Sequence, residues 1–410
     1  MNRRDFIKSA LMVATLAPLA QVANAAEKGG LADNASKGLQ VTRRPYRNTD
    51  MTMPLLGFGL MRLPQKDGKV DYATSEKMVQ MAMEAGCNYF DTAYMYLRGE
   101  SERFVGKVLS KFPRDKYFLT SKMPIAMMNS EADNERIFKE QLERTKAGYF
   151  DFYFLHWLNE AHWEKAQRLK TLDFMKKMKA EGKIRRIGFS FHGGPEVLEK
   201  IAKAYPWELA QIQLNYLDWE LCRSGDQYEV LTKLGIPVAI MEPLKGGALV
   251  NLTPEAKKVF TNANPDASIA SWGLRYAASL PNVQVVLSGM SAIEHMSDNI
   301  KTFSPLVPLS DDERKTIAQA LAAYRKAGAI PCTACRYCSP CPFGVNIPQN
   351  LAFLNQLKAG LSSFQARNIY DAMKKSERAT SCVGCGACKS KCPQKIDIPT
   401  YMKQIAASYK

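Results

Sequence analysis

Two runs of cysteines near the C-terminal end constrain the fold of this chain more than any other feature of its sequence. Each run holds four cysteines and ends in Cys-Pro, and two residues separate successive cysteines except at the last step of the second run, which has three. This spacing crowds three thiols onto one loop, which favours a shared metal cluster over disulfide bridges. Disulfide bridges and zinc are the alternatives. The eight cysteines are Cys332, Cys335, Cys338, Cys341, Cys382, Cys385, Cys388 and Cys392.

The two runs resemble those of dicluster ferredoxins, in which the fourth cysteine of each run ligates the cluster of the other run. The resemblance implies two 4Fe-4S clusters, the first held by Cys332, Cys335, Cys338 and Cys392. The second is then held by Cys382, Cys385, Cys388 and Cys341, although Cys341 departs from the standard three-residue spacing. Residues 348–376 have helical apolar spacing, so the tail resembles the α-helical ferredoxin modules of respiratory iron-sulfur subunits.

Length and periodicity predict a larger domain before the tail. At 410 residues the chain exceeds an ordinary domain, and a (β/α)8 barrel of about 250 to 300 residues would leave a tail over. From Met53 onward, short apolar runs alternate with segments of helical apolar spacing, which include 72–85, 101–112, 134–146, 163–179 and 195–204. The predicted fold class is α/β, a TIM barrel followed by a small α-helical iron-sulfur domain. The eight predicted strands are 54–62, 88–90, 117–121, 152–155, 184–189, 209–214, 237–241 and 283–287.

Polar side chains follow three of these strands, at the end where barrel enzymes keep their chemistry. Asp91, Lys122 and His156 each follow an apolar strand, and Tyr96 lies in the loop after Asp91. A free tyrosine ionises near pH 10, and a nearby ammonium favours the phenolate and lowers its pKa. We expect Lys122 to tune Tyr96 in this way, Asp91 to hold the lysine, and a neutral His156 to orient a substrate carbonyl. Taken singly, the three strand-end residues are also explained as a helix cap, a solvated lysine and a half-buried histidine.

The segment Asp91-Thr92-Ala93-x-x-Tyr96, together with Lys122 and His156, resembles the catalytic tetrad of the aldo/keto reductase family. The resemblance covers roughly residues 46 to 325. It implies hydride transfer between a nicotinamide cofactor and a carbonyl or alcohol carbon, with Tyr96 as acid or base. Lys122 and Asp91 would tune the tyrosine, and His156 would orient the substrate oxygen.

The same resemblance implies a nucleotide site at the later strand ends. Ser190 and Gln211 match the residues that hold the nicotinamide carboxamide, and Met241 stands where many members stack a tyrosine on the ring. Gly289 and His295 replace the lysine and arginine that bind the 2′-phosphate, so NAD and NADP both stay open. The other expected contacts, around the pyrophosphate and the adenine, are Glu242, Pro243, Leu244, Gly246, Asp298 and Asn299.

Residues 1–25 have the form of an export signal. The Arg3-Arg4 pair precedes an apolar stretch too short to span a membrane, and Ala23-Asn24-Ala25 has the form of a cleavage site. The pattern resembles the twin-arginine signal, which exports folded, cofactor-loaded proteins; an ordinary signal or a frayed basic end is the alternative. We therefore expect a periplasmic or otherwise exported protein that uses the twin-arginine machinery. Residues 26–45 are predicted to be a linker.

The formal net charge of +16 is concentrated in the tail, where residues 325–410 hold 13 Lys and Arg against 3 acids. Because this excess forms no compact basic block with interleaved aromatics, we expect no nucleic-acid partner. Thiolate-ligated clusters are anionic, so the charge either compensates for them or attracts an acidic redox partner protein. No apolar run reaches the roughly 18 residues of a membrane span, so none is expected in the mature protein.

These features predict an exported oxidoreductase with a reductase-like barrel at residues 46–325 and an iron-sulfur domain at 326–410. The competing hypothesis is an electron-transfer protein whose barrel is a docking or regulatory module. A binding protein with a vestigial site is a third, against which the complete tetrad argues. An exported barrel lies outside the nucleotide pool, so the nucleotide is expected to be resident. The tail is expected to contact the loops beside Tyr96, such as Arg98-Gly99-Glu100.

Overall fold

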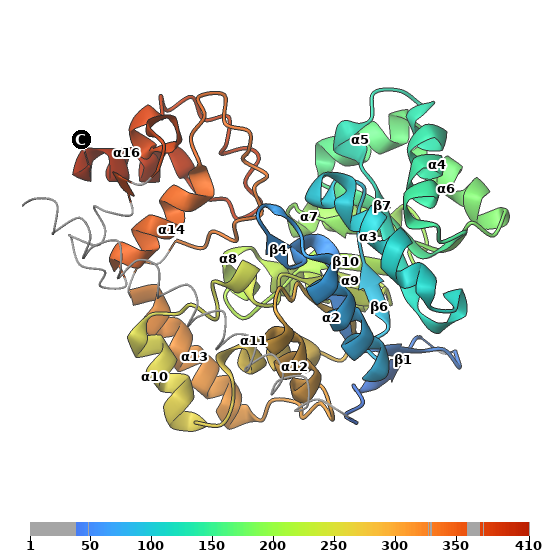
Figure 1. Cartoon of the computed structure of the whole chain (residues 1–410), viewed down its shortest axis with the longest axis horizontal. Helices are drawn as coiled ribbons and strands as arrows, with labels where there is room; N and C mark the ends of the chain where they lie inside the picture. The colour runs from blue at the N-terminus through green and yellow to red at the C-terminus, as the bar shows by residue number, and fades with distance from the viewer. Residues whose placement is uncertain are drawn as a thin grey trace, which may run out of the picture.

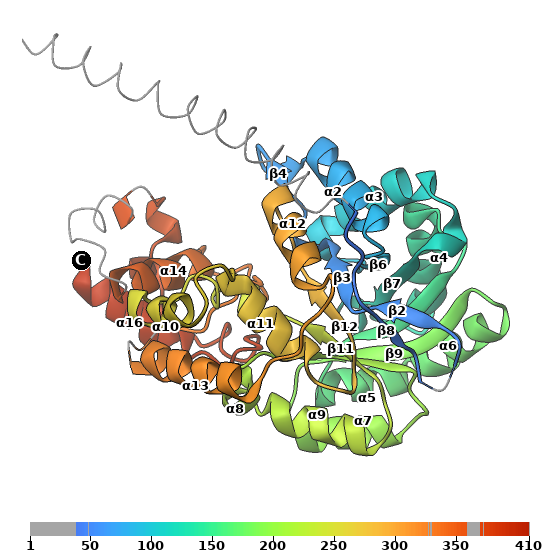
Figure 2. The same cartoon turned by 90° about the horizontal axis from the view of Figure 1, so that it is seen from below.

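The computed structural model describes residues 38–409 apart from residues 48, 327, 329, 359–369 and 372. Within these residues, eight parallel strands close into a barrel in chain order and are ringed by helices (Figures 1 and 2). This confirms the TIM barrel predicted from the sequence. The barrel strands are β3 (Leu56–Gly59), β6 (Tyr89–Asp91), β7 (Phe118–Met123), β8 (Phe150–Leu158), β9 (Ile184–Phe191), β10 (Leu209–Gln213), β11 (Val238–Met241) and β12 (Val283–Ser288).

A hairpin of β1 (Arg43–Pro45) and β2 (Thr52–Pro54) closes the end of the barrel at which the strands begin. Tyr46 and Met53 from this hairpin pack with Tyr89 and Phe152 inside the barrel. The hairpin includes residues 43–45, the last part of the segment predicted to be a linker. The predicted export signal lies outside the described residues. Apolar side chains therefore fill the end of the barrel at which the strands begin. The polar residues Asp91, Lys122 and His156 lie at the end at which the strands finish.

Helices cover the outer face of the barrel (Figure 2). The predicted helix 163–179 is wrong as a single element, because Lys170 adopts a left-handed φ of 50° and separates α5 from α6. The helices are α2 (Tyr72–Glu84), α3 (Glu100–Val108), α4 (Asp133–Thr145), α5 (Glu160–Arg168), α6 (Thr171–Ala180), α7 (Pro195–Lys203), α8 (Asp218–Leu221), α9 (Ser224–Lys233), α10 (Pro254–Ala263), α11 (Ile269–Ala278), α12 (Ile293–Thr302) and α13 (Asp311–Lys326). Shorter elements are the hairpin strands β4 (Gln65–Lys66) and β5 (Lys69–Val70) and the 3₁₀ turns η1 (Leu60–Arg62), η2 (Tyr96–Gly99), η3 (Leu109–Lys111), η4 (Arg114–Lys116), η5 (Ile125–Met127) and η6 (Lys245–Gly247).

The tail forms a second unit with its own apolar core, drawn in orange and red beside the barrel in Figure 1. It contains α14 (Ile347–Lys358), α16 (Ile398–Ser408) and the 3₁₀ turns η7 (Lys375–Glu377) and η8 (Ala379–Ser381). Helix α13 packs against α10 on the side of the barrel and leads into this unit. Among the described residues, no helix is both long enough and apolar enough to cross a membrane.

Candidate active site

Asp91 and Lys122 form a buried ion pair at the C-terminal ends of β6 and β7. The Lys122 Nζ donates to Asp91 Oδ1 at 2.6 Å and to the Thr92 carbonyl at 2.8 Å, and its side chain is 0% exposed. Gln211 Nε2 donates to the other Asp91 carboxylate oxygen at 3.2 Å. Burial raises the pKa of Asp91 and lowers the pKa of Lys122, and the ion pair opposes both shifts. Asp91 therefore holds the ammonium in place.

Tyr96 begins η2, and its ring lies close to both Lys122 and His156. The Lys122 Nζ is 4.9 Å from the centre of the Tyr96 ring. The ring centroids of Tyr96 and His156 are 5.7 Å apart, with the rings at 79° to each other. The structure thus brings together the four residues that the sequence predicted as a tetrad, although Tyr96 follows β6 and His156 lies on β8, with β7 between them along the chain.

The protonation of Tyr96 and His156 follows from their surroundings. Burial raises the pKa of Tyr96 well above its ordinary value and the Asp91 carboxylate adds to the shift, so the expected lowering of this pKa does not occur. The ammonium does not reverse the shift because Lys122 is already paired with Asp91. Burial and the Lys122 charge lower the pKa of His156 well below its ordinary value. Tyr96 is therefore a protonated donor at neutral pH, and His156 is neutral.

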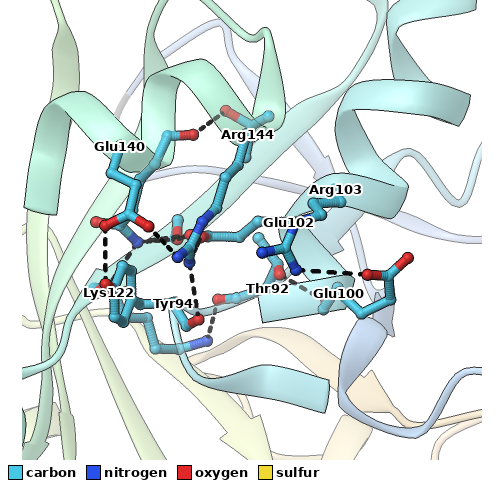
Figure 3. A network of polar contacts seen from close by, with 12 residues as sticks. Thr92, Tyr94, Glu100, Glu102, Arg103, Lys122, Glu140 and Arg144 are labelled. Atoms are coloured by element: carbon cyan, nitrogen blue, oxygen red, sulfur yellow. Dashed lines mark hydrogen bonds and ion pairs between the residues drawn. The ribbon is translucent and has the colours of Figure 1, made fainter. Parts of the chain in front are cut away.

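A buried polar network supports β7 from behind (Figure 3). Glu102 on α3 accepts hydrogen bonds at Oε1 from Ser121 Oγ at 2.8 Å and from Gln141 Nε2 at 2.6 Å. Gln141 Nε2 also donates to the Lys122 carbonyl at 3.2 Å. Arg144 on α4 pairs with the other Glu102 oxygen at 3.3 Å and with Glu140. Two helices thereby fix the strand end that carries Lys122.

The residues expected at the nicotinamide lie side by side at neighbouring strand ends. Ser190 on β9 is in register with Gln211 on β10, and Gln213 on β10 is in register with Met241 on β11. Ser190 and Gln211 are 1% and 2% exposed, and both already have partners, because the Trp157 N–H donates to Ser190 Oγ at 2.8 Å and Gln211 bonds Asp91. Ser190 accepts in its bond and keeps its hydroxyl proton, and Gln211 uses its NH2 group in its bond, so both can still bond a carboxamide.

The loop expected at the pyrophosphate is covered by the tail. Gln394 Nε2 donates to Glu242 Oε2 at 3.2 Å, while the Lys245 Nζ bonds both Gln394 and Asp218. A Cβ on Gly246 would lie 2.3 Å from the Thr333 carbonyl oxygen. A pyrophosphate does not fit this arrangement, because Glu242 adds a carboxylate and Asp218 neutralises the lysine. Two further residues of the loop serve the core: Pro243 is buried and Leu244 packs against the barrel.

The residues expected at the adenine end are also engaged within the protein. Asp298 on α12 accepts from Ser268 Oγ at 2.7 Å, and the buried Asn299 donates from Nδ2 to Ser288 Oγ at 2.7 Å. Gly289 lies beneath the Arg62 side chain, whose Cδ would be 3.1 Å from a Cβ at that glycine. These contacts stabilise the β12 end and leave the adenine role as a prediction.

The sequence-based reasoning missed the residues that join the tail to the barrel mouth. Tyr337 of the first cysteine run stacks on Trp157, with ring centroids 4.2 Å apart at an angle of 23°. Gln394 exchanges two amide hydrogen bonds with Gln213, both at 2.8 Å. In the described part of the chain, the tail contacts recorded lie at these positions, at Arg62 and at the loop 242–246, rather than at the expected Arg98-Gly99-Glu100. An aromatic within a Cys-x2-Cys step was the available signal for Tyr337, whereas Gln394 carried none.

The cysteine thiols gather around two cavities in the tail. All ten cysteines fall in the described residues and are free, so the alternative of disulfide bridges is not realised. No group of three or more His, Cys, Asp or Glu among the described residues is placed to hold a single metal ion. Four-iron clusters instead bind each thiolate to a different iron, so the two cavities fit them. One cavity is lined by Cys332, Cys335, Cys338 and Cys392, and the other by Cys341, Cys382, Cys385 and Cys388 together with Cys338.

Relatives share the barrel. The chain is 25% identical over 295 residues to the L-galactose dehydrogenase of Arabidopsis thaliana, which covers 67% of this chain and 92% of the relative. It is 24% identical to the NADH-specific methylglyoxal reductase of Escherichia coli, over 68% of this chain and 98% of the relative. A solved aldo-keto reductase of Bacillus halodurans in its holo form matches with a TM-score of 0.58 and 25% identity, over 68% of this chain and 96% of that one.

A second solved structure is an aldo-keto reductase from Klebsiella pneumoniae in complex with NADPH. It shares the fold, with a TM-score of 0.56 and 21% identity, over 70% of this chain and 95% of that one. The family model for the 4Fe-4S dicluster domain matches residues 331–396. The model for the aldo/keto reductase family matches residues 55–322, about two thirds of the chain. The chain therefore belongs to the aldo/keto reductase family and carries a 4Fe-4S dicluster domain after its barrel.

Proposed function

We propose that this protein is an oxidoreductase that interconverts a small carbonyl compound and the corresponding alcohol, with electrons exchanged through clusters in its tail. The observation that carries the proposal is the buried Lys122–Asp91 pair beside Tyr96 and His156 at the open end of the barrel. A fully buried ion pair is costly, so its position next to a phenol is better explained by chemistry than by stability.

Each residue of the tetrad has a separate task in this reaction. In the direction of reduction, Tyr96 donates its hydroxyl proton to the carbonyl oxygen, because its raised pKa keeps it protonated. Lys122, charged and fixed by Asp91, stabilises the phenolate that remains after the transfer. The neutral His156 ring hydrogen-bonds the same substrate oxygen and orients it.

The proposal assigns two 4Fe-4S clusters to the two cysteine-lined cavities. When bound, each cluster supplies or accepts one electron. Reduction of the C=O group consumes two electrons and two protons and gives CH–OH, so two clusters match one turnover. One proton comes from Tyr96 and the other from water. A one-electron carrier protein with an acidic surface, drawn to the basic tail, would reload the clusters.

A nicotinamide nucleotide is the second candidate electron source. It is favoured by the relatives, one of which is named as NADH-specific and another of which is solved with NADPH. Its pocket at Ser190, Gln211 and Met241 would open only after the tail left the loop at Gly246. Neither Gly289 nor His295 is the lysine or arginine that usually binds a 2′-phosphate. NAD is therefore a candidate beside NADP.

The test of the proposed function is Tyr96→Phe, with Tyr94→Phe as the matched control from the same loop. The first change removes the donated proton and should slow carbonyl reduction by roughly a hundredfold or more. The second removes only a hydrogen bond to Glu140. Anaerobically reduced protein is mixed with methylglyoxal, with and without NADH or NADPH, and cluster reoxidation and product are followed. Unchanged turnover in Tyr96→Phe, at equal cluster content, would place the chemistry elsewhere.

We also propose export through the twin-arginine route, on the sequence of residues 1–25 alone. Replacing Arg3 and Arg4 by lysines preserves charge but removes the arginine pair that the export machinery reads. Folded, cluster-bearing protein should then accumulate in the cytoplasm. Fractionation of cells that express the double variant checks this, and normal export would exclude the proposal.

A further inference from the structure

The segment that carries the first cysteines crosses the mouth of the barrel. At one side, the Thr333 carbonyl accepts a hydrogen bond from Arg62 Nη2 at 2.7 Å and lies against Gly246. At the other side, Tyr337 stacks on Trp157. Trp157 is held for this contact in a left-handed backbone conformation, φ 59°, next to the irregular register of β8. An aromatic residue in that conformation is strained.

The same segment uses the groups that a nucleotide would need. The Thr333 carbonyl packs against one side of the exposed Gly246, and Arg62 extends between Thr333 and Gly289. The second cysteine run adds Gln394, which is 4% exposed and bonds Gln213, Glu242 and Lys245. The Arg62, Gln213 and Gln394 side chains all form hydrogen bonds across this interface, whereas the buried Thr333 hydroxyl has no partner. Three bonded side chains at separate points favour a specific docking contact over a chance approach of two surfaces.

We propose that the segment Cys332–Cys338 occupies the nucleotide cleft of the barrel. The docked chain then excludes free NADH and NADPH, and Tyr337 forms a wall of the carbonyl site supplied by the iron-sulfur domain. The inference rests on the proposed function, which it deepens by replacing the nucleotide with the first cluster as the immediate electron partner of the Tyr96 site.

The position of Tyr337 gives this replacement a physical route. Tyr337 stands between Cys335 and Cys338, two of the cysteines that line the first cavity, and its ring contacts Trp157, which follows His156. Cys335 and Cys338 would hold the first cluster on either side of Tyr337, and a cluster held there would supply single electrons beside the Tyr96 site. Two electrons and two protons then convert C=O to CH–OH with no hydride carrier.

The first experiment measures nucleotide binding to the full-length, anaerobically purified protein with intact clusters. Equilibrium dialysis uses NADH and NADPH up to about 1 mM, the weak end of ordinary enzyme affinities. The wild type and Gln349→Ala, an exposed tail position away from the barrel, should show no saturable binding. The double variant Gln394→Ala, Tyr337→Ala removes a contact on each side of the mouth and should bind.

Hydrogen exchange at Gln213 and Trp157 identifies the variant as undocked before dialysis. Saturable binding by the wild type, nucleotide that copurifies with it, or no binding by a verified undocked variant each overturns the proposal. Failure of the proposed function is a separate outcome, seen as unchanged carbonyl reduction by Tyr96→Phe.

The second experiment tests Tyr337 directly through reoxidation of the clusters. Dithionite-reduced protein, freed of excess reductant, is mixed with methylglyoxal and the cluster absorption is followed without nucleotide. Tyr337→Phe keeps the stacked ring and should retain the wild-type rate, whereas Tyr337→Leu should lose it. Tyr401→Leu, on α16 of the same domain, is the control. Unchanged electron paramagnetic resonance spectra of the variants establish that their clusters are intact. Equal rates in Tyr337→Leu and the wild type would count against the contact. A wild type that methylglyoxal does not reoxidise would also count against it.

Discussion

Lys122 shows how one side chain can be costly for the fold and necessary for the site. Its ammonium is fully buried, and its hydrogen bonds go to Asp91 and to the Thr92 carbonyl. Removing one partner of a buried pair leaves the other charge uncompensated, which is worse than removing both. The cost of this arrangement is therefore measurable by substitution.

The first residue-scale prediction concerns this pair. Lys122→Met should lower the free energy of unfolding by about 3 kcal/mol, because it leaves the buried Asp91 carboxylate with Gln211 as its remaining side-chain partner. The double variant Asp91→Asn, Lys122→Met should regain part of that loss. Denaturant titration of Lys122→Met, Asp91→Asn, the double variant and the wild type forms the cycle. A double variant less stable than Lys122→Met would contradict this account of the pair.

The second residue-scale prediction concerns pH. Burial lowers the pKa of His192, beside Trp157 and Tyr337, from 6.5 to about 4. Between pH 6.5 and 4 the unfolded chain binds a proton at His192 that the folded chain does not bind. The free energy of unfolding is therefore unaffected by this group above pH 6.5 and decreases as the pH falls towards 4. Allowing for the partial exposure of the ring, His192→Gln should reduce the loss of stability between pH 7 and 4.5 by about 1 to 2 kcal/mol.

Denaturation of wild type and His192→Gln at matched cluster content, at both pH values, checks this prediction. The comparison cancels contributions that the two proteins share, including those of His156 and His162, whose pKa values burial also lowers. Identical pH dependence in the two proteins would show that His192 does not titrate in this window.

At the scale of elements, helices α3 and α4 act as a brace for β7 (Figure 3). Glu102 is fully buried and links Ser121 and Gln141 to Arg144, while Gly106 lets the helices approach closely, since a Cβ there would lie 2.1 Å from the Arg144 carbonyl. Because Gln141 also bonds the Lys122 carbonyl, the brace reaches the active site. The tetrad therefore depends on helix packing as well as on strand order.

The element-scale prediction is that Glu102→Gln destabilises the protein by about 2 kcal/mol, since it breaks a buried ion pair but keeps the shape of the side chain. Glu143→Gln, an exposed position on α4, should change stability by less than about 0.5 kcal/mol. Thermal or denaturant unfolding of the two variants tests the contrast. Equal effects would mean that Glu102 contributes no more than a surface carboxylate.

The whole molecule is organised by the docking of the tail on the barrel. The tail has its own apolar core, so the interface is a contact between two folded units rather than a shared core. Cys392 stands two residues before Gln394, and Cys335 and Cys338 flank Tyr337. Both docking residues are thus held by loops that the first cluster would fix. We therefore expect cluster binding and docking to be coupled.

The whole-molecule prediction is that Cys392→Ser removes the first cluster although it lies in the second run. Iron should fall to about half, because the remaining cavity keeps its own four thiols. Docking should weaken with it, so hydrogen exchange near Gln213 should rise. Cys87→Ala, which changes a barrel thiol outside both runs that bonds the Leu56 carbonyl, is the control. Loss of both clusters together, or unchanged exchange at Gln213, would contradict the crossed assignment or the coupling.

Much of this protein follows from local sequence. Short apolar runs predicted the barrel strands and helical apolar spacing predicted the helices between them, and the structure differs mainly where Lys170 breaks one predicted helix into two. The four residues expected at the active site meet because parallel strands bring their C-terminal ends to one side of a barrel. The grouping of Cys392 with the first run and Cys341 with the second was implied by the resemblance to dicluster ferredoxins and agrees with the lining of the two cavities.

Only the tertiary structure decided which barrel residues the tail contacts and how it packs against the loop expected to bind the nucleotide. Gln213 and Gln394 are 181 residues apart, and no periodicity or spacing links them. The direction of the Tyr96 pKa shift likewise could not be predicted from the sequence. It depends on how deeply the phenol is buried and on the pairing of Lys122 with Asp91. Local patterns determine which elements form and which strand ends meet. Contacts between distant segments, and the burial they create, determine whether a nucleotide loop is open to a ligand or covered by the chain itself.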